Sequence, residues 1–539
     1  MSKMTKRLLA VTLTVGMLSS TAAGFAFAEE ETDPAYAPME ETVTIHIGRS
    51  EDANASYLSG QDSLNNYVND YIRESLNVEF VYDFSVASDY ETKVSMAIAS
   101  GSMPDVMIVT ASQLRELQMA GAVEDLTDAY EAYASDNLKA AYDSTEGASF
   151  SNATFDGRLM AMPSISPGAD AIPMLFVRGD WMDELGLEAP TSVDDIVAIV
   201  NAFKENKNEN SSLVVSQTIT SESGNNTYGI DALFASYGAY PKHWITDADG
   251  NLVYGSNTPE AKTALQEIRK LVESGVIDSS FTVRDSDQCA ELVTSGQSGI
   301  FFGAWWNMSW PLNNMVEEDS SIYWNAYLAP LTEDGIYNTA TLNPSNSFLV
   351  IKAGASEEVI EAVIKVMNYQ FDIDQDQAVS LKASPEDPYS WTEMPLSILL
   401  STYTDKEDKA EAVLKAASGE IAAEELSGEA AQWYESYVAA TEDVEAAASA
   451  NNLSGWAYVR GCQPLVENAD NMNKVFDATY AKTDSMDSKW ATLEKLEDEF
   501  YLKYLNGEAT DEDFDSYVEQ WNSLGGTDIT AELVELMGE

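Results

Sequence analysis

The sequence predicts an α/β protein with more than one hydrophobic core. Apolar and polar residues alternate over 43–47 and 78–84, and a continuous apolar run covers 106–109, as is typical of strands. Helical patterns separate these segments, so the order strand, helix, strand, helix, strand predicts βαβ units and a largely parallel sheet. The chain has 539 residues, and one core rarely serves so long a chain. We therefore expect at least two lobes.

Further helices with clear start signals are predicted in the middle of the chain. Thr191 and Asp194 have the spacing of a capping box. Thr258 precedes Pro259, which places a cap before a proline at the first helical position. From about 405 to 450 the chain is rich in Ala and Glu, and there we expect exposed helices with small contact surfaces.

The composition is strongly acidic. Lys and Arg total 29 against 90 Asp and Glu, a formal net charge of −61. A field of this sign repels phosphate backbones and anionic lipid headgroups, so we expect no general binding to nucleic acid or to membrane surfaces. Aromatic residues make up 10% of the chain, which favours a folded protein over a disordered one.

Cysteine and histidine are scarce. The cysteines are Cys289 and Cys462, and the histidines are His46 and His243. These numbers exclude a disulfide framework and a Cys-rich metal site, although one bridge stays open. They also argue against zinc catalysis. We predict no metal and no cofactor.

Residues 1–28 have the pattern of a secretory signal. A basic start precedes an apolar run, and a small-x-small cleavage site ends at Ala28. We expect an exported chain, extracellular or periplasmic, that begins with a disordered acidic leader at 29–41. Thr21 stands where a lipoprotein box would carry its lipidated cysteine, so no lipid anchor is expected there.

Motifs in a fixed order identify a family resemblance. They are ASGSMPDV at 99–106, GRLMAMP at 157–163, RGDWMDELGL at 178–187 followed by Pro-Thr, and the C-terminal pattern from 490 to 526. In this order they resemble the bacterial extracellular solute-binding proteins of family 1, which deliver oligosaccharides to ABC transporters. The match extends over nearly the whole mature chain.

The resemblance implies a two-lobe periplasmic-binding-protein-like fold of type II, with a ligand cleft between α/β lobes joined by crossover strands. The implied boundaries are 42–160 plus 328–375 for lobe 1, and 161–327 plus 376–539 for lobe 2. The implied function is reversible binding of an oligosaccharide and its delivery to ABC transporter permease subunits. We expect a monomer that binds no nucleic acid and does not insert into a membrane.

The segment 299–307 gives the sharpest local signal for a ligand. A strand ends at Gly303, and Trp305, Trp306 and Asn307 follow. A sugar ring presents an apolar face and a rim of hydroxyls, so a binder needs an aromatic plate and amide partners. In the resembling maltose-binding type of protein, this segment carries a stacking tryptophan. The alternative is a pair of core tryptophans.

Other candidates lie where strand ends should meet the cleft, since open α/β sheets bind ligands beyond their carboxyl edges. Each also has a structural interpretation, as a cap, a turn residue or, for the arginine beside Asp180, an ion pair. The candidates are Thr110, Ser112, Asp170 and Asn65 as polar contacts, Tyr228 and Trp456 as aromatic plates, and Arg178.

Calcium is not expected. Long members of the resembling branch often place a calcium loop after the helix that here ends near 204, but residues 206–212 offer amides instead of alternating carboxylates. Residues 247–251 alternate oxygen ligands too, yet they fit a hairpin turn better.

Two other classes of protein remain as alternatives. With so many acids, a secreted glycoside hydrolase using paired carboxylates is the first. The second is a secreted surface protein or adhesin. The chain contains no G-x-S-x-G, P-loop, G-x-G-x-x-G or H-E-x-x-H motif, so we expect a binder and no enzyme.

Overall fold

The computed structural model describes residues 33–52, 55, 57, 59–221, 227–374 and 393–537. The predicted signal segment lies outside these residues. Part of the predicted leader lies inside them and is ordered, contrary to the prediction. Ala35 and Met39 are buried, and the Tyr36 hydroxyl donates a 2.6 Å hydrogen bond to Asp372.

The first unit contains a five-stranded sheet in the order β2-β1-β3-β13-β6. β1 is parallel to β2 and β3, as predicted, whereas β13 runs antiparallel to β3 and β6. The strands are β1 (Val43–Ser50), β2 (Val78–Val86), β3 (Val106–Val109), β6 (Met162–Pro163) and β13 (Phe348–Ile351), with a small hairpin of β4 (Thr154–Phe155) and β5 (Arg158–Leu159). The helices are α1 (Tyr67–Leu76), α2 (Tyr90–Ser100), α3 (Ala111–Met119), α4 (Thr127–Tyr133), α5 (Asp136–Asp143) and α12 (Glu357–Asp374).

The second unit contains a three-stranded antiparallel sheet in the order β10-β7-β11. Its strands are β7 (Met174–Arg178), β10 (Ile300–Gly303) and β11 (Trp324–Tyr327), with a hairpin of β8 (Trp244–Thr246) and β9 (Leu252–Tyr254). The helices before residue 320 are α6 (Gly179–Leu185), α7 (Val193–Asn206), α8 (Asp231–Ser236), α9 (Pro259–Glu273), α10 (Ser286–Thr294) and α11 (Leu312–Glu318).

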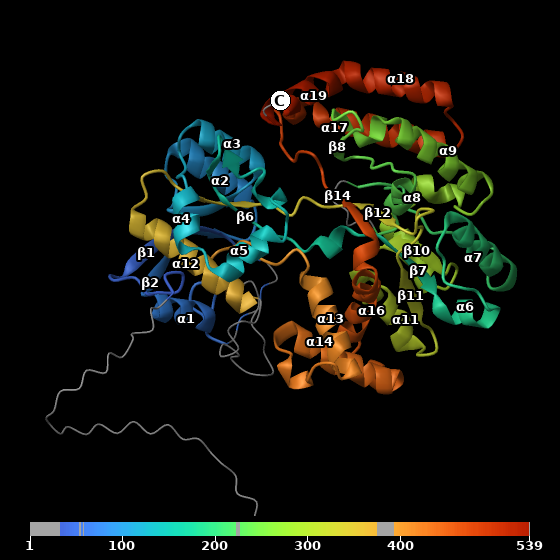
Figure 1. Ribbon diagram of the computed structural model, residues 1–539, viewed down its shortest axis with the longest axis horizontal. Helices are drawn as coiled ribbons and strands as arrows, with labels where there is room; N and C mark the ends of the chain where they lie inside the picture. Colours follow the sequence, from blue (N-terminus) through green and yellow to red (C-terminus); the bar gives the residue numbers. More distant parts are fainter. Residues whose placement is uncertain are drawn as a thin grey trace, which may run out of the picture.

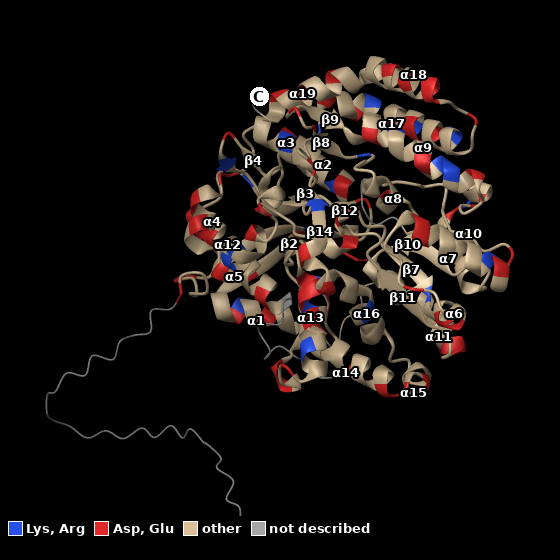
Figure 2. Cartoon of the chain, turned by 45° about the vertical axis from the view of Figure 1, so that its right-hand side comes forward, with Lys and Arg blue, Asp and Glu red and all other residues tan. Residues whose placement is uncertain are grey.

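The C-terminal third of the chain adds helices to the second unit. They are α13 (Asp405–Ser418), α14 (Gly428–Glu442), α15 (Val444–Ser449), α16 (Ser454–Glu467), α17 (Asp484–Leu505), α18 (Asp511–Trp521) and α19 (Thr527–Met537). Between the units, β12 (Tyr337–Ala340) pairs in parallel with β14 (Met472–Val475), as Figure 1 shows. Asp and Glu outnumber Lys and Arg on most of the helices (Figure 2).

Each unit has its own hydrophobic core. The first core contains residues from Met39 to Ile165 and again from Phe348 to Leu400, and the second core contains the buried residues between and after these segments. The chain therefore crosses between the cores after Ile165, after Tyr337 and after Leu400. The last two crossovers come later in the sequence than the boundaries that the resemblance implied.

Local signals explain several elements. α9 begins at Pro259 with the Thr258 hydroxyl accepting from the Ala261 amide, as predicted. The cap of α7 is one residue later than predicted, because Ser192 and Asp195 form the capping box. Residues 247–251 form the turn of the β8–β9 hairpin, also as predicted.

Candidate functional site

The ends of the strands define one edge on each sheet from which the crossovers leave. In the first sheet, Val109 at the end of β3 pairs with Phe348 at the start of β13. In the second sheet, Gly303 at the end of β10 pairs with Met174 at the start of β7. The chain reaches β7 and β13 directly from the other unit, so these two edges are on the crossover side of their sheets.

An aromatic cluster occupies the crossover side of the second sheet. Trp305 follows β10 in a short 3-10 helix, η5 (Trp305–Met308), and is 6% exposed. Its ring centroid lies 6.0 Å from that of Trp433 and 5.2 Å from that of Tyr458. The Lys406 Nζ lies 5.8 Å from the centroids of both tryptophans, and Trp305 Nε1 donates a 2.8 Å hydrogen bond to Asp170 Oδ1. We call these five residues the Trp305 cluster.

The burial of Asp170 changes its electrostatics. This carboxyl lies on the first crossover, in the 3-10 helix η2 (Gly168–Ala171). Burial raises the pKa of Asp170, while the hydrogen bond from Trp305 and the charge of Lys406 oppose the rise. Asp170 is only partly buried, so an oxygen of this carboxyl can accept from a ligand hydroxyl.

A network of four charges holds Lys406 in place. Lys406 Nζ lies 2.9 Å from Asp405 and 3.3 Å from Glu429, and Lys409 Nζ lies 2.9 Å and 2.7 Å from the same carboxylates. Burial raises the pKa of Asp405, but the two lysines outweigh it and hold that pKa below its ordinary value. Burial lowers the pKa of Lys406, but Asp405 and Glu429 raise it above its ordinary value. The network therefore stays charged and joins α13 to α14.

Two glycines allow the backbone to approach the cluster. A Cβ at Gly461 of α16 would lie 2.0 Å from the Trp305 carbonyl oxygen. A Cβ at Gly168 would lie 2.4 Å from the ring of Tyr403, and the Gly168 amide donates a 2.7 Å hydrogen bond to the Tyr403 carbonyl. Only glycine permits these contacts. Gly461 brings α16 against Trp305, and Gly168 brings the first crossover against the third.

The residues after Trp305 have different environments. Trp306 is half-buried, and its ring is nearly parallel to that of Trp310 at a centroid distance of 6.4 Å. Trp310 is 52% exposed and was not predicted. Asn307 is fully buried, accepts from the Ala304 amide and the Thr227 hydroxyl, and donates to the Trp310 carbonyl. The structure gives Asn307 a local role in place of the predicted ligand contact, because its amide is bound to its own loop and to Thr227.

Two further predicted contacts belong to the core of the second unit. Tyr228 is buried against Phe301 at a centroid distance of 5.0 Å, so it is no exposed plate. Arg178 is buried and forms two hydrogen bonds with Asp180, at 2.8 Å and 2.6 Å, under the ring of Trp181. The structural ion pair was the alternative interpretation of Arg178, and the structure supports it.

The structure separates the remaining candidates from the Trp305 cluster or gives them local roles. Thr110 caps α3 in a capping box with Gln113. Ser112 is exposed in the first turn of the same helix. Asn65 is exposed and bonds to Asp62, while the neighbouring Asn66 caps α1. Trp456 is half-buried on α16, beneath the guanidinium of Arg460 at 4.7 Å.

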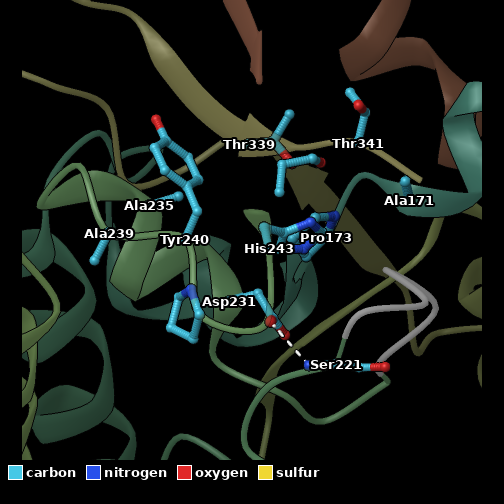
Figure 3. A pocket seen from close by; sticks show the side chains of 12 residues that line it. Ala171, Pro173, Ser221, Asp231, Ala235, Ala239, Tyr240, His243, Thr339 and Thr341 are labelled. Carbon is cyan, nitrogen blue, oxygen red and sulfur yellow. Dashed lines mark hydrogen bonds between the residues drawn. The ribbon is translucent and has the colours of Figure 1, made fainter. Parts of the chain in front are cut away.

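Two cavities lie near the crossovers. One, of about 350 Å³, is lined by Asn346 and Ser347 before β13 and by residues 397–400, which come just before the third crossover, so it opens at the crossover edge of the first sheet. The other lies between α8, His243 and β12 (Figure 3) and has a volume of about 20 Å³. That volume suits one water molecule and excludes a sugar ring.

Sequence reasoning missed the residues that α13, α14 and α16 bring to Trp305. The Ala- and Glu-rich segment was predicted as exposed helices, but Asp405 and Trp433 are buried. Lysines three residues apart and a tryptophan among small residues were the available signals.

Metal and disulfide chemistry find no support in the described ranges. There, no three or more His, Cys, Asp or Glu side chains gather as metal ligands. Cys289 and Cys462 are both buried and free, so the bridge that stayed open does not form. Among the helices of the described chain, none has the length and apolarity to cross a membrane.

Two α/β units with separate cores, joined by crossovers beside an aromatic cluster, define a two-lobe binding protein. The family model of the bacterial extracellular solute-binding proteins matches residues 55–371. This is more than half of the chain, so the chain belongs to that family.

Curated relatives agree with this assignment. The chain is 26% identical over 249 residues to the fructooligosaccharide ABC transporter substrate-binding protein FusA of Streptococcus pneumoniae, a match that covers 43% of this chain and 44% of FusA. It is 26% identical over 261 residues to the lipoprotein LipO of Bacillus subtilis, of which 48% is covered. The chain thus spans about half the length of these two. It is 23% identical to the polygalacturonan/rhamnogalacturonan-binding protein YtcQ of Bacillus subtilis, covering 83% of this chain and 82% of YtcQ.

Solved structures show the same fold. A solute-binding protein from Bifidobacterium longum infantis, described as HMO-binding, superposes with a TM-score of 0.59 at 14% identity, over 92% of this chain and 98% of that one. The alginate-binding protein AlgQ2 superposes with a TM-score of 0.57 at 13% identity, over 94% of this chain and all of AlgQ2. The chain therefore has the two-lobe, type II periplasmic-binding-protein-like fold, with its cleft between the lobes.

Proposed function

We propose that this protein is the exported solute-binding component of an ABC importer. It binds an oligosaccharide in the cleft between the lobes, without converting it, and delivers it to membrane permease subunits. The names of FusA and YtcQ, which refer to oligosaccharide and polysaccharide ligands, support this class of ligand. Cleavage after Ala28 and a monomeric state are part of the proposal.

The Trp305 cluster is the observation that carries the proposal. Its aromatic rings lie beside a crossover, where closure of the lobes would bring a ligand into contact with both units. Tyr458 and Asp170 are partly exposed, so they can offer an aromatic surface and a hydroxyl acceptor to a sugar. Trp305 is buried and contacts both of them, so it holds them in position.

The cavity at the crossover edge of the first sheet supports a site shared by both lobes. Asn346, Ser347 and Ser397 line it, and these amide and hydroxyl groups suit the rim of a sugar ring. The Ser397 hydroxyl donates to the Ser50 carbonyl at the end of β1, which places the cavity beyond a carboxyl strand end.

Calorimetric titration of residues 29–539 with pooled neutral and acidic oligosaccharides tests this function. We expect heat that saturates at about one ligand per chain. Heat that continues steadily after each injection would indicate turnover, and the proposed function would then be hydrolysis of the oligosaccharide and not its binding. If no pool gave any heat, the proposal that the ligand is an oligosaccharide would be overturned.

Two matched variants then test the site. Trp305→Ala should weaken binding of the oligosaccharide found, whereas Trp306→Ala should leave it within about threefold, since Trp306 pairs with Trp310 outside the cluster. A loss confined to Trp306→Ala would place the aromatic surface at the Trp306–Trp310 pair and overturn the assignment to the Trp305 cluster.

A further inference from the structure

A second groove lies on the second unit, apart from the Trp305 cluster. It has a volume of about 450 Å³ and is bounded by α16, the edge strand β11 and the segment before α7. Its polar lining includes Thr191, Asn325, Arg460, Gln463, Glu467 and Asn468. Neither the Trp305 cluster nor the first unit contributes a lining residue. Pockets of this size commonly hold small ligands.

Arg460 is the unusual member of this lining. Its Nη2 donates to the Trp324 carbonyl at 2.6 Å and to Asn325 Oδ1 at 3.2 Å, and its guanidinium lies over the ring of Trp456. Within the described residues, these partners are all uncharged. In a chain with 90 Asp and Glu, a partly buried arginine that contacts no carboxylate of the described residues calls for an explanation.

Arg178 is the comparison within the same unit. It is similarly enclosed, but Asp180 neutralises it through two hydrogen bonds. For Arg460, burial lowers the pKa. Among the described residues the opposing contributions come from Tyr437, Tyr323 and Tyr327, and none comes from a carboxylate. An enclosed cation without an anion is destabilised, and a bound anion would relieve that cost.

The free donors of Arg460 match a carboxylate. Both hydrogen bonds of its guanidinium use Nη2, so Nη1 and Nε remain for a ligand. These two nitrogens donate from different edges of the guanidinium, so each can give a carboxylate one charge-assisted hydrogen bond. Glu467 lies two helical turns further along α16, roughly 10 Å away, and accepts a 2.6 Å hydrogen bond from Gln463. A negative charge at that end disfavours dianions and polyanions.

We propose that this groove binds a small hydroxylated carboxylate, of the sugar-acid class, through Arg460. The carboxylate lies on the guanidinium, and the ligand hydroxyls donate to the side-chain oxygens of Gln463, Asn468 and Thr191. The donors of these three side chains are already bonded to Glu467, the Pro464 carbonyl and Asp195. This is a site beyond the cleft and does not depend on the oligosaccharide proposed for it.

Calorimetric titration of residues 29–539 with glucuronate tests the groove. We expect saturable binding that Arg460→Gln weakens by about tenfold or more, and that Arg460→Lys restores only in part, because lysine keeps the charge but not the positions of the guanidinium donors. The methyl ester of glucuronate and acetate should both bind at least about tenfold more weakly. The ester lacks the charged carboxylate, and acetate lacks the hydroxyls. Trp305→Ala should leave glucuronate binding unchanged.

A second pair of variants serves if Arg460→Gln fails to fold. Gln463→Glu adds a carboxylate to the groove and should weaken glucuronate binding, whereas Glu467→Gln removes one and should strengthen it. Three outcomes overturn the proposal: no binding of glucuronate by the unsubstituted chain, equal binding of acetate, or a loss caused by Trp305→Ala but not by the groove variants. The last outcome would assign glucuronate to the cleft.

Discussion

The indole of Trp305 donates a 2.8 Å hydrogen bond to Asp170, across 135 positions of sequence. Asp170 lies on the first crossover, and Trp305 lies on the loop that follows β10. The bond therefore links the segment that joins the two units to the candidate ligand site. A movement of Asp170 should therefore displace Trp305, and the reverse.

Substitutions at Trp305 and Asp170 should separate the contribution of the Trp305 ring to ligand binding from that of its hydrogen bond to Asp170. We expect Trp305→Phe, which keeps a ring but loses the N–H, to weaken oligosaccharide binding by about 1 kcal/mol. Trp305→Ala should cost about 2 kcal/mol or more, since Tyr458 then also loses the ring against which it packs. Asp170→Ala should cost more than Trp305→Phe, because it also removes the proposed acceptor of a ligand hydroxyl. Calorimetry of the single and double variants measures these effects, and strictly additive losses would show that the bond does not couple the two residues.

The charge network on α13 should contribute measurably to stability. Lys409 contacts Asp405, which is 4% exposed, and Glu429. Lys409→Ala should lower the free energy of unfolding by about 2 kcal/mol, because Lys406 still pairs with Asp405. Lys415→Ala on the same helix removes a more exposed pair with Glu411 and should cost less than about 0.5 kcal/mol. Urea unfolding compares the two, and equal losses would refute a special role of the network.

Arg178 should act on stability and not on ligand affinity. Asp180 and the ring of Trp181 enclose its guanidinium. Arg178→Ala should lower the free energy of unfolding by about 3 kcal/mol, since it leaves a carboxylate without its partner. Thermal unfolding gives this value, and calorimetry of the folded fraction should give the same oligosaccharide affinity as the unsubstituted chain. A fall in oligosaccharide affinity without a loss of stability would instead assign Arg178 to the ligand site.

The fold could be predicted where the information is local. The apolar run at 106–109 and the Thr258-Pro259 start signal gave the bounds of β3 and the start of α9 correctly. The insertion of β13 between β3 and β6 could not be foreseen, because strand pairing depends on contacts between distant segments. For the same reason the crossovers came later in the chain than expected.

The site was predicted only in part. Trp305 and Asp170 were both candidates, but nothing local indicates that they bond to each other. The structure does not place Asn307 and Tyr228 as ligand contacts. The amide of Asn307 is hydrogen-bonded inside the protein, and the ring of Tyr228 packs in the core. Lys406 was missed because compensating charges on a helix look like a solvated surface.

A buried carboxyl in the C-terminal helices makes the stability of the protein depend on pH. Glu497 of α17 is 1% exposed and accepts hydrogen bonds from the Tyr254 hydroxyl at 2.8 Å and the Ser256 hydroxyl at 2.7 Å. Burial raises its pKa to about 7, while Lys242 and these hydrogen bonds oppose the rise and Asp498 adds to it. The folded state therefore holds a proton that the unfolded state releases near its ordinary pKa of 4.5.

This difference sets the sign of the effect. Between pH 4.5 and about 7 the folded state binds more protons than the unfolded state, so the contribution of Glu497 to stability falls as the pH rises through that window. The fall is on the order of 3 kcal/mol. Glu497→Gln should remove it, so the variant should gain stability relative to the unsubstituted chain between pH 5 and pH 8. Urea unfolding at both pH values measures this gain. Glu499→Gln, at an exposed position of the same helix, is the control and should show no comparable gain. A Glu497→Gln difference that is the same at both pH values would contradict a proton held at this site.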